Sequence, residues 1–263
     1  MSTADSAQTG ATLIANAWHG GTTLDALPDT CRPTTLAQGY QIASALGATV
    51  RDRVVGWKIA ATSAQGQAHI GVDGPVAGRL FAGRVFASPA SVSLTHNHMC
   101  VAECEFVFRL KHSLPPAATP YTRAQVLAAI DSTHIGVELP SSRFTDFASA
   151  GAAQLAADNA CAHHMVIGPA VDVDIKTLDL ASVRTYIHIN GESACTGSGS
   201  DVLGHPLDAL AWLANSHVDR GEGIDAGQFV TTGVTGQPTP VSAGNVVTAG
   251  IEGFGEIRVE LAV

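Results

Sequence analysis

Apolar residues recur at three- and four-residue spacing in the early part of the chain. Within residues 35–51, the positions that share one helical face are Leu36, Tyr40, Ala43, Leu46 and Val50. Residues 7–18 have a helical pattern as well, and a Gly-Gly pair followed by a proline-bounded segment separates the two stretches. The pattern therefore predicts two helices before residue 54.

From residue 54 onward the apolar runs are short and bounded by Gly, Pro and Ser, which is typical of strands. The dipeptide Asn190-Gly191 favours a type I′ turn after a strand over residues 186–189. Residues 246–251 and 257–261 read as a second hairpin, joined through a Gly-Phe-Gly turn. An antiparallel or mixed sheet is expected, and a doubly wound parallel sheet is not.

Two helices are expected to interrupt this β-rich body. Thr122 and Gln125 form a T-x-x-Q capping box at the start of the first. Pro206 suits the first position of the second, which buries a row of leucines and meets Gly221 as its stop. The chain is therefore predicted to be an α+β protein, with a helical annex over residues 1–53 and a β-rich domain over residues 54–263.

Composition narrows the classes of partner. The 263 residues are 46% hydrophobic and carry a net charge of −9 with no cluster of Lys or Arg, which argues against nucleic acid and anionic lipid as partners. No apolar run reaches the roughly 18 residues of a membrane span, and the first residues lack a basic, apolar leader. A cytoplasmic protein with five reduced cysteines and no membrane partner is expected.

Several common catalytic motifs are absent from the sequence, namely GxSxG, GxxxxGK[ST], HExxH and GxGxxG after a strand. His96, His98 and Cys100 alternate as ligands on a strand would, but no fourth ligand accompanies them, so we interpret them as a polar loop. Cys161 precedes a His-His pair at 163–164 and is interpreted as a buried small residue instead of a nucleophile. Serine-elbow hydrolases, P-loop NTPases and Rossmann dehydrogenases are disfavoured.

Three glutamates stand in strand-like apolar settings. Glu103 and Glu105 point to the same face of a strand over residues 100–110, with no Lys or Arg within three residues. Two adjacent carboxylates repel, so this face is either solvated or holds a hard divalent cation. Glu138 lies in an apolar run where an unpaired charge would be costly. The set of three indicates a site for Mg²⁺ or Mn²⁺.

Lys58 is isolated inside the apolar run of residues 54–60. It either extends its ammonium to water from a strand end or lies buried beside a substrate carboxylate or enolate. Residues 157–161 form a short polar turn that offers backbone amides and the carboxylate of Asp158. By itself this turn is only a loop.

The ordered motifs resemble one enzyme family. The segments are GWKIAATS, GVDGPVAGRLFAG, AECEFVF, VELPSSR, ADNA, GSGSDVLGHPLDALAWLA, TTG and AGNVVTAGIEGFGEI, spread from about residue 40 to residue 263. Together they resemble the 2-keto-4-pentenoate hydratase and 4-oxalocrotonate decarboxylase branch of the fumarylacetoacetate hydrolase superfamily. The resemblance implies a mixed or antiparallel β-roll over residues 54–263, and it makes that β-rich domain the catalytic one.

The resemblance also implies roles for individual residues. Glu103, Glu105 and Glu138 would bind Mg²⁺ or Mn²⁺. Catalytic roles fall to Lys58, Asp73 and Asp158, any of which could position the attacking water. Substrate contacts are implied for Ser63, Leu80, Thr232 and Gly233.

This chain departs from the family pattern near the implied site. The hydratases usually have an aspartate and an aromatic residue where it has Val76 and Ala77, and Ser141 stands where they have an aspartate. The metal chemistry is expected to survive these changes. The pocket for the substrate tail is expected to differ from that of a pentadienoate.

The resemblance implies a metal-dependent lyase that adds water to an unsaturated 2-oxo acid such as 2-hydroxypenta-2,4-dienoate, in the catabolism of aromatic compounds. Decarboxylation of a 2-oxo dicarboxylate is the nearest alternative. Hydrolysis of an acylpyruvate is disfavoured because no histidine precedes a glutamate at H-x-x-E spacing. A non-catalytic scaffold subunit is disfavoured by the intact glutamates and lysine. A homo-oligomer, with or without a partner enzyme of the same pathway, is expected.

Overall fold

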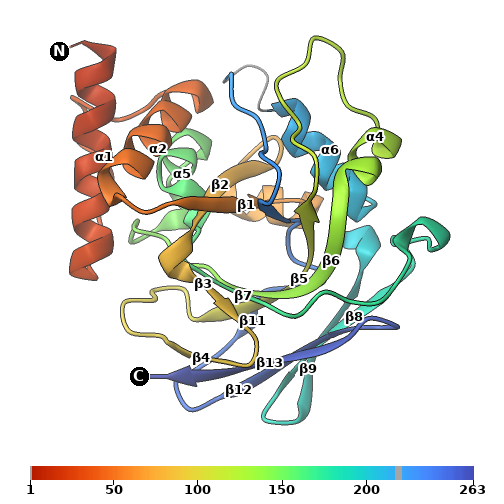
Figure 1. Ribbon diagram of the computed structural model, residues 1–263. Coiled ribbons are helices and arrows are strands. Elements are labelled where there is room, and N and C mark those ends of the chain that lie inside the picture. Colours follow the sequence, from red (N-terminus) through yellow and green to blue (C-terminus); the bar gives the residue numbers. More distant parts are fainter. Residues whose placement is uncertain (1, 217–220) are drawn as a thin grey trace.

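The computed structural model describes residues 2–216 and 221–263. Two sheets form the β-rich body, and helices α1 and α2 lie together at one side of it (Figure 1). The helices are α1 (Thr3–Gly20), α2 (Leu36–Val50), α3 (Ala64–Ile70), α4 (Arg123–Ala129), α5 (Ala152–Ala157) and α6 (Pro206–Ser216).

The larger sheet carries Lys58 and the three glutamates. Its eight strands run in the order β2 (Val76–Phe81), β1 (Val54–Ala60), β10 (Phe229–Thr231), β5 (Val101–Leu110), β6 (Ile130–Leu139), β7 (His164–Ile167) and β3 (Val85–Ala87), with β11 (Thr239–Pro240) on β5. Strands β1 and β10 pair in parallel, as do β3 and β7, while the others pair antiparallel. The sheet is mixed, as expected.

A second sheet of five strands completes the body. Its order is β4 (Ala90–Ser93), β13 (Gly255–Ala262), β12 (Val246–Ile251), β8 (Arg184–Ile189) and β9 (Glu192–Ser198). It lies below the larger sheet in Figure 1, and one apolar core is shared by the two. Phe106 of β5 contributes to this core with an edge-on ring contact to Phe254, centroids 5.8 Å apart.

The predicted local signals are largely confirmed. The predicted capping box begins α4 at Thr122, and the structure adds one at Thr35, where α2 begins. The hairpin β8–β9 turns at Asn190 and Gly191, both with positive φ, and β12 pairs with β13 as expected. Helix α6 starts at Pro206, whereas its predicted stop at Gly221 follows residues outside the described part of the chain.

Two features of the body were not predicted. Helices α3 and α5 have only seven and six residues, so neither is long enough to display a helical period in the sequence. The parallel pairs also escaped prediction, because β1 and β10 lie far apart along the chain.

The annex packs directly on the body. Ile14 and Trp18 of α1 and Leu46 of α2 share an apolar cluster with Phe81 and Phe144, which belong to the β-rich part. The division at residue 53 matches the gap between α2 and β1, but whether the two parts are separate domains stays a prediction.

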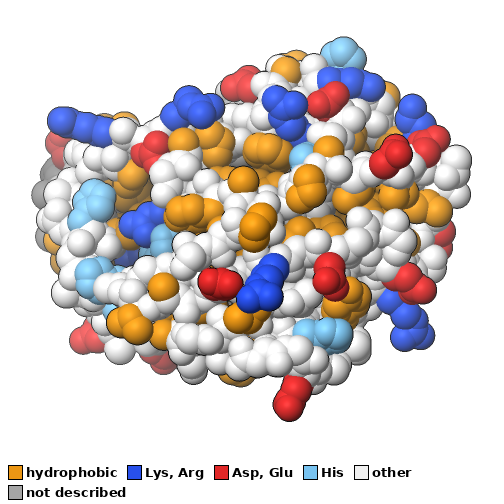
Figure 2. Space-filling view, turned by 60° about the horizontal axis from the view of Figure 1, so that its bottom comes forward, with side chains coloured by type: hydrophobic (Ala, Val, Ile, Leu, Met, Phe, Trp, Pro, Cys, Tyr) orange, Lys and Arg blue, Asp and Glu red, His pale blue; other side chains and the backbone are white. Residues whose placement is uncertain are grey.

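Charged side chains are few in the sequence and are spread over the surface. In Figure 2, acidic and basic side chains are interspersed among hydrophobic ones over the visible face. Within the described residues, no helix is both long and apolar enough to cross a bilayer.

Candidate metal centre and substrate cavity

Three glutamates meet on neighbouring strands. Glu103 of β5 lies directly opposite Glu138 of β6, and Glu105 is two residues further along the same face of β5. One carboxylate oxygen of each lies within 4.8 Å of the others. The predicted grouping of these acids is therefore confirmed by the geometry.

Several oxygens of this cluster have no hydrogen-bond partner. Glu105 and Glu138 are fully buried, yet Oε1 of Glu105 and both oxygens of Glu138 have no hydrogen-bond partner, although Oε1 of Glu138 forms an ion pair with Lys58. Oε2 of Glu105 accepts from the amide of Gly233 at 2.7 Å. Buried carboxylate oxygens without donors are costly, and a hard divalent cation is the group that satisfies several of them at once.

The pKa values of the clustered glutamates also favour a bound cation. Burial and the charge of Glu138 raise the pKa of Glu103 to about 8. Burial and the same neighbour raise the pKa of Glu105 well above its ordinary value. A bound divalent cation would reverse this effect, because it stabilises the ionised carboxylates.

Lys58 lies against the glutamates. Its side chain is 3% exposed, with Nζ 3.2 Å from Oε1 of Glu138 and 3.0 Å from the carbonyl oxygen of Ala160. Burial alone would lower the pKa of Lys58, but the three carboxylates outweigh it and raise the pKa above its ordinary value. The ammonium stays charged, and the alternative of a lysine reaching out to water is wrong.

A strained turn gives Lys58 its second contact. Asn159, Ala160 and Cys161 all have positive φ, between 51° and 59°. The turn approaches β2 so closely that a Cβ on Gly78 would lie 2.1 Å from the carbonyl oxygen of Asn159. The Asn159 side chain also bonds both backbone groups of Arg79. These contacts hold the turn on β2, beside the strand that carries Lys58.

Asp158 has a different role from the predicted one. It is fully buried, its Oδ1 lies 2.5 Å from Nε of Arg143, and its Oδ2 accepts from the Ser142 hydroxyl and the Arg143 amide. Because its oxygens are occupied by these donors and it does not line the cavity, it cannot reach a water there. Asp158 is therefore not a catalytic residue as predicted. It holds Arg143 and the adjoining turn in place. Arg143 itself was missed, because an arginine in a loop gives no sequence signal of burial.

Three other predicted residues also lie away from the cavity. Asp73 is exposed in the loop before β2, and Leu80 packs in a small apolar cluster with Val107 and Met165. The hydroxyl of Thr232 donates to the Phe106 carbonyl at 3.2 Å, so this residue ties β10 to β5. None of the three lines the cavity beside Lys58, which corrects their assignment to catalysis or substrate contact.

Gly233 and Ser63 are placed at the site. Gly233 has a φ of 103°, and a Cβ there would lie 2.3 Å from Oγ1 of Thr62, so only glycine lets its amide reach Glu105. Ser63 lines the cavity, and its hydroxyl accepts from the Gly66 amide to cap α3.

The structure places histidines from both of the groups noted in the sequence. His98 lines the cavity, in a turn that precedes β5. His163 and His164 both lie against Arg84, with Nε2 3.3 and 2.7 Å from its Nη1. Cys161 is half-buried and lines the cavity, whereas a fully buried residue was expected. Burial raises the pKa of its thiol to about 12, which disfavours the thiolate that a nucleophile needs.

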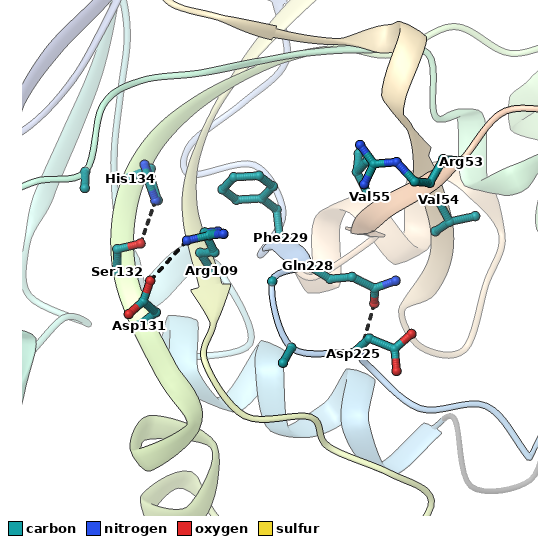
Figure 3. Close-up of a pocket in the computed structure, with 13 residues that line it drawn as sticks. Arg53, Val54, Val55, Arg109, Asp131, Ser132, His134, Asp225, Gln228 and Phe229 are labelled. Atoms are coloured by element: carbon teal, nitrogen blue, oxygen red, sulfur yellow. Dashed lines mark hydrogen bonds and ion pairs between the residues drawn. The ribbon is translucent and has the colours of Figure 1, made fainter.

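The cavity beside the glutamates has a volume of about 480 Å³ and is lined by Lys58 and Glu103. A larger, separate cavity of about 940 Å³ lies near the starts of β1 and β10. Figure 3 shows its arginines, Arg53 and Arg109, around Phe229, with Arg109 paired to Asp131. Glu103 is the member of the glutamate cluster that lines the smaller cavity, together with Lys58, so we take this cavity as the candidate active site.

Comparisons with known proteins agree with this geometry. Residues 65–262 match the family model described as fumarylacetoacetate (FAA) hydrolase C-terminal. A 2-keto-4-pentenoate hydratase of Burkholderia vietnamiensis is 33% identical over 98% of both chains. A 2-hydroxyhexa-2,4-dienoate hydratase of Comamonas testosteroni is 34% identical over 80% of this chain and 78% of its own.

A solved structure is similar along nearly the whole chain. It is the 4-oxalocrotonate decarboxylase from Pseudomonas putida G7 complexed with magnesium and adipate, with a TM-score of 0.90, 27% identity and 99% of both chains covered. The fold is thus the one implied by the ordered motifs. This chain belongs to the fumarylacetoacetate hydrolase family, in the branch of the 2-keto-4-pentenoate hydratases and 4-oxalocrotonate decarboxylases.

Proposed function

We propose that the protein is a divalent-metal-dependent lyase that adds water to an unsaturated 2-oxo acid such as 2-hydroxypenta-2,4-dienoate. The observation that carries the proposal is the cluster of Glu103, Glu105 and Glu138, in which buried oxygens of Glu105 and Glu138 have no hydrogen-bond partner. The charged Lys58 lies beside this cluster, and Glu103 and Lys58 line one cavity. Hydratases among the relatives support the reaction type.

The three glutamates would hold Mg²⁺ or Mn²⁺, because their all-oxygen donor set suits a hard cation. When bound, the cation supplies Lewis-acid polarisation to the carboxylate and 2-oxo oxygens of a substrate. The amide of Gly233 fixes one oxygen of Glu105 and so orients that ligand.

Lys58 supplies a fixed positive charge at the substrate. Its ammonium is held between Glu138 and the carbonyl of Ala160, so it is preorganised and needs no rearrangement when negative charge grows on the 2-oxo oxygen. Its raised pKa makes it a poor base. Lys58 therefore acts by electrostatics and orientation.

Decarboxylation of a 2-oxo dicarboxylate is the second candidate, favoured by the decarboxylase fold match over the full chain. Both reactions use the same metal, lysine and 2-oxo head group. They differ in whether the substrate carries a second carboxylate at its far end.

One assay separates the two. The Mg²⁺-loaded protein is incubated with 2-hydroxypenta-2,4-dienoate and, separately, with 4-oxalocrotonate, while dienoate absorbance and released CO₂ are followed. Decay of the dienoate without CO₂ supports the hydratase, and CO₂ from 4-oxalocrotonate supports the decarboxylase. No change with either substrate would overturn the proposed function.

The proposal extends to a cytoplasmic homo-oligomer working in aromatic-compound catabolism. It rests on the Gly- and Ala-rich, weakly charged composition and on the family. Light scattering at micromolar concentration that returns the monomer mass of 26.9 kDa would refute the oligomer.

A further inference from the structure

One wall of the candidate active site is apolar. Ile70 of α3, Val76 of β2, Leu155 of α5 and Phe147 before α5 all line the cavity and pack in a single apolar cluster. Val76 and Leu155 are buried, whereas Ile70 and Phe147 are half-buried. Four separate elements thus converge on one hydrophobic surface.

This wall adjoins Lys58, which lines the same cavity. The ammonium lies between Oε1 of Glu138 and the carbonyl oxygen of Ala160, and Ala160 belongs to the same apolar cluster as the wall. A 2-oxo acid whose carboxylate and keto oxygens lie at the glutamates and Lys58 would have its tail in this cavity, where the wall offers an apolar surface.

The tail end of the cavity has no fixed positive charge. Among the described residues that line it, Lys58 is the sole Lys or Arg, and Glu138 already pairs with it. His69 and His98 are the remaining lining side chains able to carry positive charge, and the His69 ring packs edge-on against Phe147, centroids 5.9 Å apart. A second carboxylate buried here would lose its hydration without a permanent partner.

The cavity is also larger than a five-carbon acid requires. Its volume of about 480 Å³ falls in the range of roughly 300 to 1,000 Å³ that holds drug-sized ligands. We infer that the substrate is a 2-oxo acid with an uncharged, apolar tail longer than that of a pentadienoate, and that a terminal carboxylate is rejected. The inference rests on the proposed function for the position of the head group.

Binding of unreactive analogues tests this without turnover. Calorimetry on the Mg²⁺-loaded protein compares pyruvate, 2-oxohexanoate and 2-oxoadipate, the last two having the same carbon chain and differing in the terminal carboxylate. Each buried methylene is worth about fourfold in affinity. We expect 2-oxohexanoate to bind at least about tenfold more tightly than pyruvate, and 2-oxoadipate to bind no more tightly than pyruvate. Tighter binding of 2-oxoadipate than of 2-oxohexanoate overturns the inference.

Two variants test whether the apolar wall causes the selectivity between 2-oxohexanoate and 2-oxoadipate. Phe147→Arg and Ile70→Arg add a cation at half-buried positions, and each should raise 2-oxoadipate affinity at least about tenfold while weakening 2-oxohexanoate. Leu178→Arg is the matched control, because Leu178 is 41% exposed and does not line the cavity. Unchanged selectivity in both folded wall variants contradicts the inference. If neither variant folds, the wild-type series decides alone.

The outcome is separable from that of the proposed function. The expected order of binding with no turnover of any dienoate would leave the tail site standing and remove the lyase. Turnover of dienoates with 2-oxoadipate as the tightest analogue would keep the lyase and remove the apolar tail site.

Discussion

At the scale of single residues, the site is defined by oxygens that the protein leaves without donors. Sequence spacing placed Glu103 and Glu105 on one face, and the register of β5 and β6 brings Glu138 opposite. The same spacing could not show that Glu105 and Glu138 are buried with several oxygens that have no hydrogen-bond partner, because this depends on the strands packed around them.

Removing the charge of two ligands should abolish metal binding. The double variant Glu103→Gln, Glu105→Gln loses two of the three carboxylates, so Mn²⁺ affinity measured by calorimetry should fall at least about a hundredfold, the upper range for losing residues around a metal site. Glu192→Gln, at an exposed position of β9, is the control and should bind Mn²⁺ normally. Undiminished affinity in the double variant would exclude this metal site.

Lys58 should matter for catalysis and not for metal retention. Lys58→Met keeps the apolar stem and removes the charge, so kcat should fall by about 10² or more, the effect of losing one preorganised electrostatic donor. Lys111→Met removes an exposed lysine and should leave kcat unchanged. A rise in KM with kcat intact would assign Lys58 to ground-state binding alone. Both constants within about twofold of wild type would deny it either role.

At the scale of elements, local signals predicted what depends on neighbouring residues. Thr122 with Gln125 predicted the start of α4, and Asn190-Gly191 predicted the turn of β8 and β9. The predicted roles of Asp158 and Thr232 failed for a different reason. Their partners, Arg143 and the carbonyl of Phe106, are set by tertiary contacts that no periodicity reveals.

The contact between β2 and the turn at 159–161 should be sensitive to one methyl group. Gly78→Ala would push a Cβ against the carbonyl of Asn159, displacing the turn that binds Lys58. We expect a loss of about 1–3 kcal/mol in stability and a lower kcat. Gly74→Ala, where the added Cβ meets nothing within 4 Å, should change neither the melting temperature nor the activity. Equal effects of the two substitutions would contradict this role of the turn.

The contact between β7 and Arg84 should weaken in acid. Burial and the nearby Arg84 lower the pKa of His164 to about 4, while an unfolded histidine titrates near 6.5. Between these values the unfolded state binds more protons, so stability falls as pH falls, by about 1.4 kcal/mol per pH unit for this group.

His164→Gln tests that dependence, because glutamine can still accept from Arg84 without titrating. The melting temperature of the variant should fall less steeply than that of wild type from pH 6.5 to pH 4.5. His112→Gln, at an exposed position, should follow the wild-type curve. Parallel curves for wild type and His164→Gln would show that His164 does not carry the effect.

At the scale of the whole molecule, the sequence was informative because many weak motifs occur in the family order. Each is a short loop or strand, and the structure brings the segments that carry Lys58, Glu103, Glu138 and Gly233 around one centre. The ordered motifs thus predicted the fold, and they included the three glutamates that the structure brings together. They could not predict the shape and charge of the tail pocket, which four separate elements build.

The central claim is that this centre adds water to an unsaturated 2-oxo acid with the help of a divalent cation. Mass spectrometry of the product from 2-hydroxypenta-2,4-dienoate tests it most directly, with Mg²⁺-loaded protein and with protein stripped by EDTA. We expect a product heavier than the substrate by one water, formed only with the metal and restored when Mg²⁺ is added back. An unchanged substrate mass with the metal-loaded protein, or equal conversion after stripping, would contradict the account.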